Sequence, residues 1–112
     1  MRPYINCWAF RTMNLSPETL LQTETVLVRK MSLAPHEVAP LHYHTHMFEH
    51  IVCLVGEISV LTQLGGETKL LPGQCTSVQP TLQHQVKNPL NTISQYLLTQ
   101  SGGSYDFSLV SA

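Results

Sequence analysis

The stretch Glu49–Gly73 reads EHIVCLVGEISVLTQLGGETKLLPG, and its pattern decides the class of fold. Three runs rich in β-branched and long apolar residues, 49–55, 57–64 and 67–71, are separated by glycine. The Gly65-Gly66 pair suits a tight hairpin turn, because glycine reaches the positive φ values that such a turn requires. Pro72-Gly73 ends the third run. The stretch therefore predicts three consecutive strands.

The same kind of run recurs on both sides of this stretch. Further strands are predicted over 24–33, 74–79, 83–87, 91–99 and 105–110, with Pro80 and Pro89 between them. One helical turn is predicted from Ser16-Pro17-Glu18-Thr19 through Leu21, since a capping serine, a first-turn proline and an acid follow each other. Many short strands with Gly/Pro turns predict an all-β sandwich or small barrel.

The composition excludes several classes of protein. With 112 residues, one domain is expected over 1–112. Six Lys and Arg against seven Asp and Glu leave no basic stripe, so no nucleic-acid partner is expected. No apolar run approaches 18 residues, so no membrane partner is expected, and the N-terminus does not resemble a signal peptide. Three cysteines without CxxC spacing favour the reducing cytoplasm.

Histidine is unusually frequent, and its distribution is informative. Four of the six histidines lie within Leu41–His50, LHYHTHMFEH. In an extended chain His42, His44 and His46 share one face, because side chains at i, i+2 and i+4 do so. Glu49 adds a carboxylate, and His84 is the remote candidate. Clustered imidazoles repel one another when protonated, so the pattern favours a metal site that a closed sheet would assemble.

These residues also match the two motifs of a known family, and the chain resembles a cupin over about 24–99. The first motif, G-x5-H-x-H-x(3,4)-E-x6-G, and the second, G-x5-P-x-G-x2-H-x3-N, are matched by His42, His44, Glu49, Gly56, Gly73, His84 and Asn88. Three turn positions depart: His36 and Thr81 replace glycines, and Gln79 replaces the proline.

The resemblance implies a small double-stranded β-helix, or jelly-roll barrel, with a conserved part over about 24–99. The apolar segment over about 4–10, YINCWAF, lies outside that part and is expected to form an N-terminal strand extension. It implies His42, His44, Glu49 and His84 as ligands of Fe(II), Mn(II), Ni(II), Cu(II) or Zn(II). A pairing of His44 with His46, in place of His42, remains an alternative. Cupins of this size resemble dimer formers, so a homodimer is expected.

Further residues are candidates for the cavity of such a barrel. Strand parity places Arg29 on the more apolar face of its strand, where it could bind a carboxylate or phosphate. Gln83 and Tyr96 are also substrate-binding candidates, although parity alone leaves Gln95 as an alternative to Tyr96. His46 is the candidate general base. Cys53 is expected to face inward as a small hydrophobic residue.

Three functions fit this combination. The first is a metal-dependent enzyme acting on a small polar molecule, by sugar-type isomerisation or ring opening, or by dioxygenation. The second is a non-catalytic cupin that binds or senses a small molecule. The third is a purely structural metal site. Because a fold hosts many functions, the choice depends on the site itself.

Overall fold

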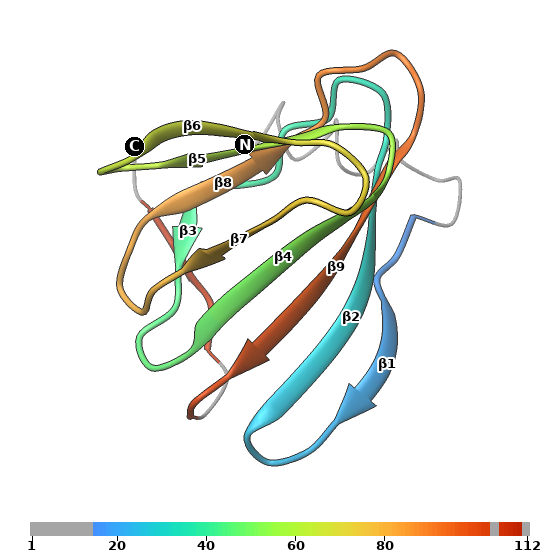
Figure 1. Cartoon of the computed structure of the whole chain (residues 1–112). Helices are drawn as coiled ribbons and strands as arrows, with labels where there is room; N and C mark the ends of the chain where they lie inside the picture. The colour runs from blue at the N-terminus through green and yellow to red at the C-terminus, as the bar shows by residue number, and fades with distance from the viewer. Residues whose placement is uncertain (1–14, 104–105, 111–112) are drawn as a thin grey trace.

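Ten strands in two antiparallel sheets make up the fold of the described residues, 15–103 and 106–110, in the computed structural model (Figure 1). In chain order they are β1 (Glu18–Gln22), β2 (Val26–Leu33), β3 (His42–Tyr43), β4 (Phe48–Val55), β5 (Ile58–Thr62), β6 (Gly66–Leu70), β7 (Cys75–Val78), β8 (His84–Lys87), β9 (Ser94–Ser101) and β10 (Ser108–Leu109). The predicted all-β class is confirmed.

The order of strands in each sheet explains how remote segments meet. One sheet has the order β1-β2-β9-β4-β7 and the other β10-β3-β8-β5-β6. Neighbours in the sheets are far apart in sequence, so β9 lies between β2 and β4, and β3 pairs with β8 through His42 and His84. The predicted N-terminal strand over 4–10 lies outside the described residues.

The predicted helical turn is wrong. Residues Glu18–Gln22 form strand β1, which pairs with β2 through contacts such as Glu18 with Lys30 and Leu21 with Val28. A lone turn would satisfy few backbone groups, whereas pairing gives β2 a hydrogen-bonded neighbour on its open side. Within the described ranges no helix has the length and hydropathy to cross a membrane.

The hairpin between β5 and β6 is slightly longer than predicted. Thr62 pairs with Gly66, so residues 63–65 form the turn and Gly66 begins the returning strand at a φ of 70°. Thr62 Oγ1 accepts a hydrogen bond from the Gly65 N–H at 2.8 Å. The turn thus closes through a side chain as well as through the glycine.

The core lies between the two sheets and comes from alternate residues of the strands. Ile51 and Cys53 of β4, Ile58 and Val60 of β5, and Tyr96 of β9 belong to one buried cluster. Their spacing by two follows strand geometry, because successive side chains point to opposite faces. The inward orientation predicted for Cys53 is what the structure shows.

Two turns adopt a conformation that their residues disfavour. His36 has a φ of 58° and Thr81 a φ of 69°, in the left-handed region. These are the two positions where glycine was expected by resemblance and is not present. The backbone conformation typical of glycine is thus retained without the glycine, at a cost of about 1–2 kcal/mol for each L-residue.

Candidate metal centre

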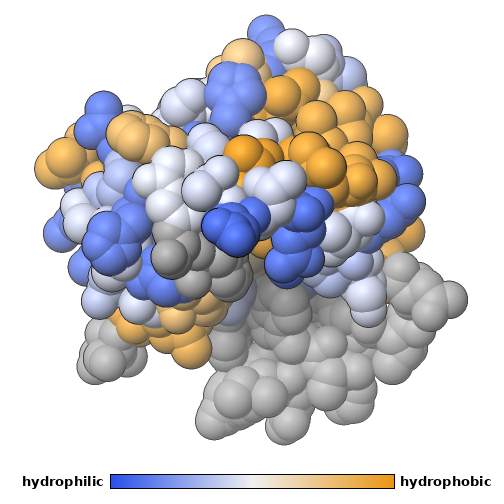
Figure 2. Space-filling view, turned by 90° about the horizontal axis from the view of Figure 1, so that it is seen from below, coloured by the Kyte–Doolittle hydropathy of each residue, from blue (hydrophilic) through white to orange (hydrophobic). Residues whose placement is uncertain are grey.

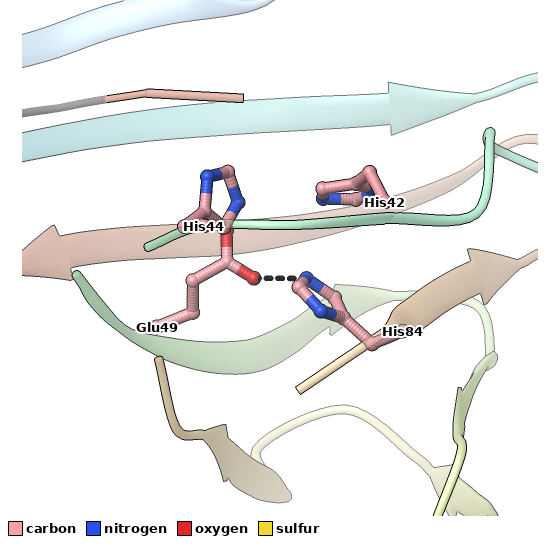
Figure 3. A group of neighbouring side chains, drawn as sticks. All are labelled: His42, His44, Glu49 and His84. Carbon is pink, nitrogen blue, oxygen red and sulfur yellow. Dashed lines mark ion pairs between the residues drawn. The ribbon is translucent and has the colours of Figure 1, made fainter. Parts of the chain in front are cut away.

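Four side chains point toward one another (Figure 3). His42 comes from β3, His44 follows directly after that strand, Glu49 lies near the start of β4, and His84 begins β8. Each offers one ligand atom, and these atoms all lie within 4.8 Å of one another. His44, Glu49 and His84 are buried and His42 is partly buried. The cluster contains His42 and does not contain His46, which favours the first of the two predicted histidine pairs.

Backbone carbonyls fix the orientation of all three imidazoles. His42 Nδ1 lies 2.8 Å from the Pro40 carbonyl oxygen, and His84 Nδ1 lies 2.8 Å from that of Leu82. His44 Nδ1 contacts the carbonyl oxygen of Asp106. A carbonyl only accepts, so each Nδ1 carries the proton, and the other ring nitrogen, Nε2, is left for a further partner. This arrangement is typical of histidines that bind a metal.

Glu49 lies at the centre of the cluster. Its Oε2 is 2.8 Å from His44 Nε2 and its Oε1 is 2.5 Å from His84 Nε2. Gln100, the residue paired with Glu49 across β9 and β4, donates an amide hydrogen bond to Oε2 at 2.7 Å. Burial raises the pKa of the Glu49 carboxyl, but the hydrogen bonds with His44 and His84 outweigh burial and hold this pKa well below its usual range. Glu49 is therefore a carboxylate near neutral pH.

The histidines differ in their affinity for a proton. Burial lowers the pKa of His42 from 6.5 to about 4, and the charge interaction with His84 acts in the same direction. Burial also opposes protonation of His44, but its hydrogen bond and charge interaction with Glu49 raise its pKa above 6.5. Of His42 and His44, it is therefore His44, between Asp106 and Glu49, that holds a proton more strongly. Three imidazole nitrogens and a carboxylate oxygen, so arranged, fit a divalent transition ion.

A cavity of about 250 Å³ borders this cluster. His42, Glu49 and His84 form part of its wall. Most of the remaining wall is apolar and comes from both sheets: Met31, Ala39, Pro40, Ile51, Val86, Leu98 and Phe107, with Arg29, Tyr96 and Gln100. A small ligand in this cavity would therefore lie against the candidate metal ligands on one side and against hydrophobic side chains on the others.

The predicted substrate-binding residues separate into two groups. Arg29 and Tyr96 line the cavity, and Tyr96 is buried. Burial raises the pKa of the Tyr96 hydroxyl, so it stays protonated. Gln83, which precedes β8, does not line this cavity. His46 is exposed, does not line the cavity, and lies 2.9 Å from Thr45 Oγ1 through Nδ1.

Three contributors to the site were not predicted. Gln100 lies on the same face of β9 as Tyr96 and Leu98, because these residues are two positions apart. This spacing was the one feature of the sequence that indicated an inward-facing Gln100. Phe107 stacks on His42, with ring centroids 4.4 Å apart. Asp106 contacts His44 through its carbonyl oxygen. Its carboxylate accepts hydrogen bonds from the Thr45 N–H and hydroxyl, at 3.0 and 2.8 Å. Neither of these last two residues belongs to a recognisable motif.

Two antiparallel sheets with a buried His/His/Glu/His cluster define a class of small β-proteins with a potential metal site. A family model described as Cupin domain matches residues 29–99. The chain therefore belongs to the cupin family. A search of curated proteins found no match.

Solved structures with the same fold are numerous and distant in sequence. A double-stranded β-helix protein from Klebsiella pneumoniae is 21% identical, with a TM-score of 0.77 and coverage of 91% of this chain and 90% of that one. A cupin sugar phosphate isomerase from Silicibacter pomeroyi is 21% identical (TM-score 0.63; coverage 69% and 50%). An oxalate oxidase is 19% identical (TM-score 0.69; coverage 77% and 46%). The chain spans about half of each of these two enzymes.

Proposed function

We propose that the protein is a metal-dependent enzyme that binds its ion through His42, His44, Glu49 and His84. The observation that carries the proposal is the convergence of four ligand atoms within 4.8 Å at the wall of a cavity. Buried imidazoles and a buried carboxylate are expensive to maintain unless a charged partner compensates them. A site that opens onto a cavity also leaves space for a substrate, which a structural metal site does not need.

A divalent transition ion, when bound there, supplies a Lewis acid and a binding position for O₂ or a substrate oxygen. The protein's own residues do the rest. The carbonyls of Pro40, Leu82 and Asp106 hold the three rings in one tautomer. Gln100 fixes the Glu49 carboxylate. Because most of the wall is apolar, a charge inside the cavity is screened less than a charge in water.

The cavity wall favours dioxygenation over sugar isomerisation. The similar structures include both an oxidase and an isomerase, so the fold leaves the choice open. A sugar would bring several hydroxyl groups against side chains such as Met31, Ile51 and Leu98, which offer no hydrogen bonds. A mostly apolar substrate avoids this penalty. In a dioxygenation both atoms of O₂ enter the product, so no further reductant is required.

The proposal is tested by metal analysis followed by turnover. Untagged protein and His84→Ala are purified, and their metal content is measured by mass spectrometry. We expect His84→Ala to retain less than a tenth of the wild-type metal. Both proteins are then made metal-free and reloaded with Fe(II) without oxygen. O₂ consumption is recorded with short carboxylates, diketones and thiols, and sugar conversion is followed by NMR.

The outcomes separate the competing functions. Fe(II)-dependent O₂ uptake by the wild type, lost in His84→Ala, supports a dioxygenase. Sugar conversion without O₂ uptake supports the isomerase instead. Equal metal in both proteins contradicts the ligand assignment. Tight binding of a small molecule without turnover favours the binding or sensor alternative, and unfolding on metal removal favours a structural site.

We also propose that the protein forms a homodimer through the outer face of one of its two five-stranded sheets, β1-β2-β9-β4-β7. Val28, Val52 and Leu97 are only partly buried and stand next to core residues of their strands, so they point away from the core, and the exposed Leu21 pairs with Val28. In Figure 2, the view from below, the broadest apolar area lies at the upper right. Light scattering is expected to give a dimer for the wild type and a monomer for Leu97→Glu, and a wild-type monomer would contradict the proposal.

A further inference from the structure

Two of the four candidate metal ligands lie on a segment that is flanked by residues 106–110, which we call the strap. The strap includes β10, which occupies the edge of its sheet next to β3. The backbone of β10 pairs with that of His42 and Tyr43, and the Val110 N–H donates to the Leu41 carbonyl oxygen at 3.1 Å. The strap therefore runs alongside the part of the chain that carries the first two histidines of the cluster.

His44 differs from the other two imidazoles of the cluster in what holds its ring. The Nδ1 atoms of His42 and His84 lie 2.8 Å from carbonyl oxygens only two residues back in the chain. The Nδ1 of His44 instead contacts the carbonyl oxygen of Asp106, which is 62 residues further along. The rings of His42 and His84 are thus oriented by their own local backbone, whereas the ring of His44 is oriented by a remote segment.

Asp106 also fixes the backbone beside His44. Its carboxylate accepts a hydrogen bond from the Thr45 N–H at 3.0 Å and another from the Thr45 hydroxyl at 2.8 Å. A carboxylate can do this because its two oxygens serve two donors at once. Since Thr45 follows His44 directly, one residue of the strap holds both the imidazole ring and the peptide next to it.

Phe107 restrains the same pair of histidines from the side of the cavity. Its ring stacks on His42, with centroids 4.4 Å apart and planes inclined by 19°, and meets the ring of His44 edge-on, with centroids 5.8 Å apart. Phe107 also lines the cavity. One aromatic side chain therefore contacts both imidazoles that the neighbouring segment provides.

We propose that the strap positions His42 and His44 for the metal ion, with Asp106 and Phe107 as positioning residues, and that metal binding in turn tightens the docking of the strap. The inference rests on the proposed metal centre, which it extends to a segment outside the four ligands. The second effect follows from the first by reciprocity. If the docked strap raises the affinity for the metal, the bound metal favours the docked strap by the same factor.

The strap is lightly attached, so its docking can respond to the metal. Strand β10 has only two residues, and the side chains of Phe107 and Leu109 are 45% and 62% exposed. Segments that bury little apolar surface open locally at a lower free energy than the whole domain needs to unfold. A metal ion that fixes His42 and His44 presents an ordered surface to the strap and so opposes this local opening.

The Zn(II) affinity of the purified protein tests the positioning role, by competition with a chelating dye. Asp106→Ala removes the carboxylate and leaves the backbone carbonyl, and Asp106→Asn keeps one acceptor oxygen. Phe107→Leu removes the stacked ring and keeps an apolar side chain. Leu109→Ala is the matched control, because Leu109 belongs to the same strap and its side chain is largely exposed. The thermal midpoint of each metal-free variant is recorded as well.

We expect Asp106→Ala and Phe107→Leu each to weaken Zn(II) binding by about tenfold or more, and Leu109→Ala to change it by less than about twofold, because residues that orient metal ligands have effects of this size. Asp106→Asn should recover part of the affinity, and it replaces Asp106→Ala if that variant does not fold. The metal-free midpoints should stay close to that of Leu109→Ala, which separates positioning from a general loss of stability. Zn(II) affinities equal to that of Leu109→Ala overturn the inference.

Hydrogen exchange of the wild type tests the reciprocal effect. The Val110 and Thr45 amides report the docked strap, since one donates to the ligand-bearing segment and the other to the Asp106 carboxylate. The Thr23 amide, which donates within the turn between β1 and β2, is the reference. We expect Zn(II) to slow exchange of the first two amides by about tenfold or more and to change that of Thr23 by less than about twofold. Equal exchange with and without Zn(II) at Val110 and Thr45 overturns the inference.

The two assays separate this inference from the proposed function. A wild type that binds no Zn(II) contradicts the metal centre and the inference together. Zn(II) binding that is indifferent to Asp106 and Phe107 leaves the metal centre standing and overturns only the positioning role. Zn(II) binding that depends on the strap, in a protein that turns over no substrate, supports the inference and favours the binding or sensor alternative over an enzyme.

Discussion

Replacing Gly56 with alanine should destabilise the fold far more than the same change at another glycine of similar conformation. Gly56 follows β4 with a φ of 78°. A Cβ atom added there would lie 2.4 Å from Ser94 Oγ and 3.2 Å from Ser94 Cβ. The Ser94 hydroxyl already makes hydrogen bonds: it accepts one from the Glu57 N–H at 3.2 Å and lies 2.9 Å from Asn88 Oδ1. It has no room to move without losing these contacts.

The size of the effect follows from two separate terms. An L-residue in the left-handed region lowers the free energy of unfolding by about 1–2 kcal/mol. Alanine also restricts the unfolded chain more than glycine does, which raises the free energy of unfolding by about 0.4–1 kcal/mol. Displacing the buried Ser94 hydroxyl adds about 1–3 kcal/mol through a lost hydrogen bond and overpacking. Gly56→Ala should therefore lose about 3 kcal/mol of stability, or roughly 10 °C in the thermal midpoint for a domain of this size.

Gly66→Ala is the matched control. Gly66 has a φ of 70°, and an added Cβ meets nothing within 4 Å. Gly66→Ala therefore has the same backbone strain as Gly56→Ala but no steric clash, so the expected loss in the free energy of unfolding is about 1 kcal/mol. Chemical denaturation of both variants measures the difference. Adding Ser94→Ala to Gly56→Ala should give a smaller loss than the sum of the single changes. Equal losses for the two glycine variants, or strict additivity in the double variant, would refute the reasoning.

Three further predictions concern the turns and the metal centre. Thr81→Gly and His36→Gly should each raise stability by about 0.5–1 kcal/mol in urea denaturation, because they relieve the positive φ; a loss at both positions would contradict this account. Gln100→Leu should weaken metal binding by about 10–100-fold in competition titrations while the protein stays folded, because the Glu49 carboxylate loses its donor; unchanged affinity would show that Gln100 is not needed. The raised pKa of His44 stabilises the metal-free fold below about pH 6.5, and this contribution is lost as pH rises through the folded-state pKa. A metal ion must displace that proton, so metal affinity should rise with pH. Over the same range, pH 6.5 to 8, the thermal midpoint of the metal-free protein should fall. If metal affinity and thermal midpoint both rose or both fell with pH, a proton held at His44 would be contradicted.

The sequence was sufficient to predict most strands because inward and outward residues alternate clearly in them. Ile51 and Cys53 repeat on one face of β4, and Ile58 and Val60 begin the next strand of the core. The four residues of the cluster were predicted from a spacing that resembles the cupin motifs. The structure brings them within 4.8 Å, although their service as metal ligands stays a prediction.

The parts that were missed depend on contacts between distant segments. Strand β1 contains a bulge between Thr19 and Leu21 and is exposed along its whole length, so it shows no alternating pattern. Phe107 reaches His42 from the C-terminal segment, and nothing local to either residue indicates this contact. His46 shares the parity of His42 and His44, but the chain turns after β3, so extended geometry no longer applies there.

The two missing motif glycines, at His36 and Thr81, show why tertiary structure, and not residue identity alone, maintains the site. Thr81 donates its backbone N–H to the His44 carbonyl oxygen at 2.6 Å, so the strained turn before His84 is tied to the segment that carries another candidate ligand. His36 donates its N–H to the Leu90 carbonyl oxygen at 3.0 Å and is followed by the buried Glu37. In both turns, contacts with another part of the chain hold a left-handed residue that would be unfavourable in isolation. The position of His84 therefore depends on the strand pairing around it, and a glycine at Thr81 should relax the turn without moving the imidazole.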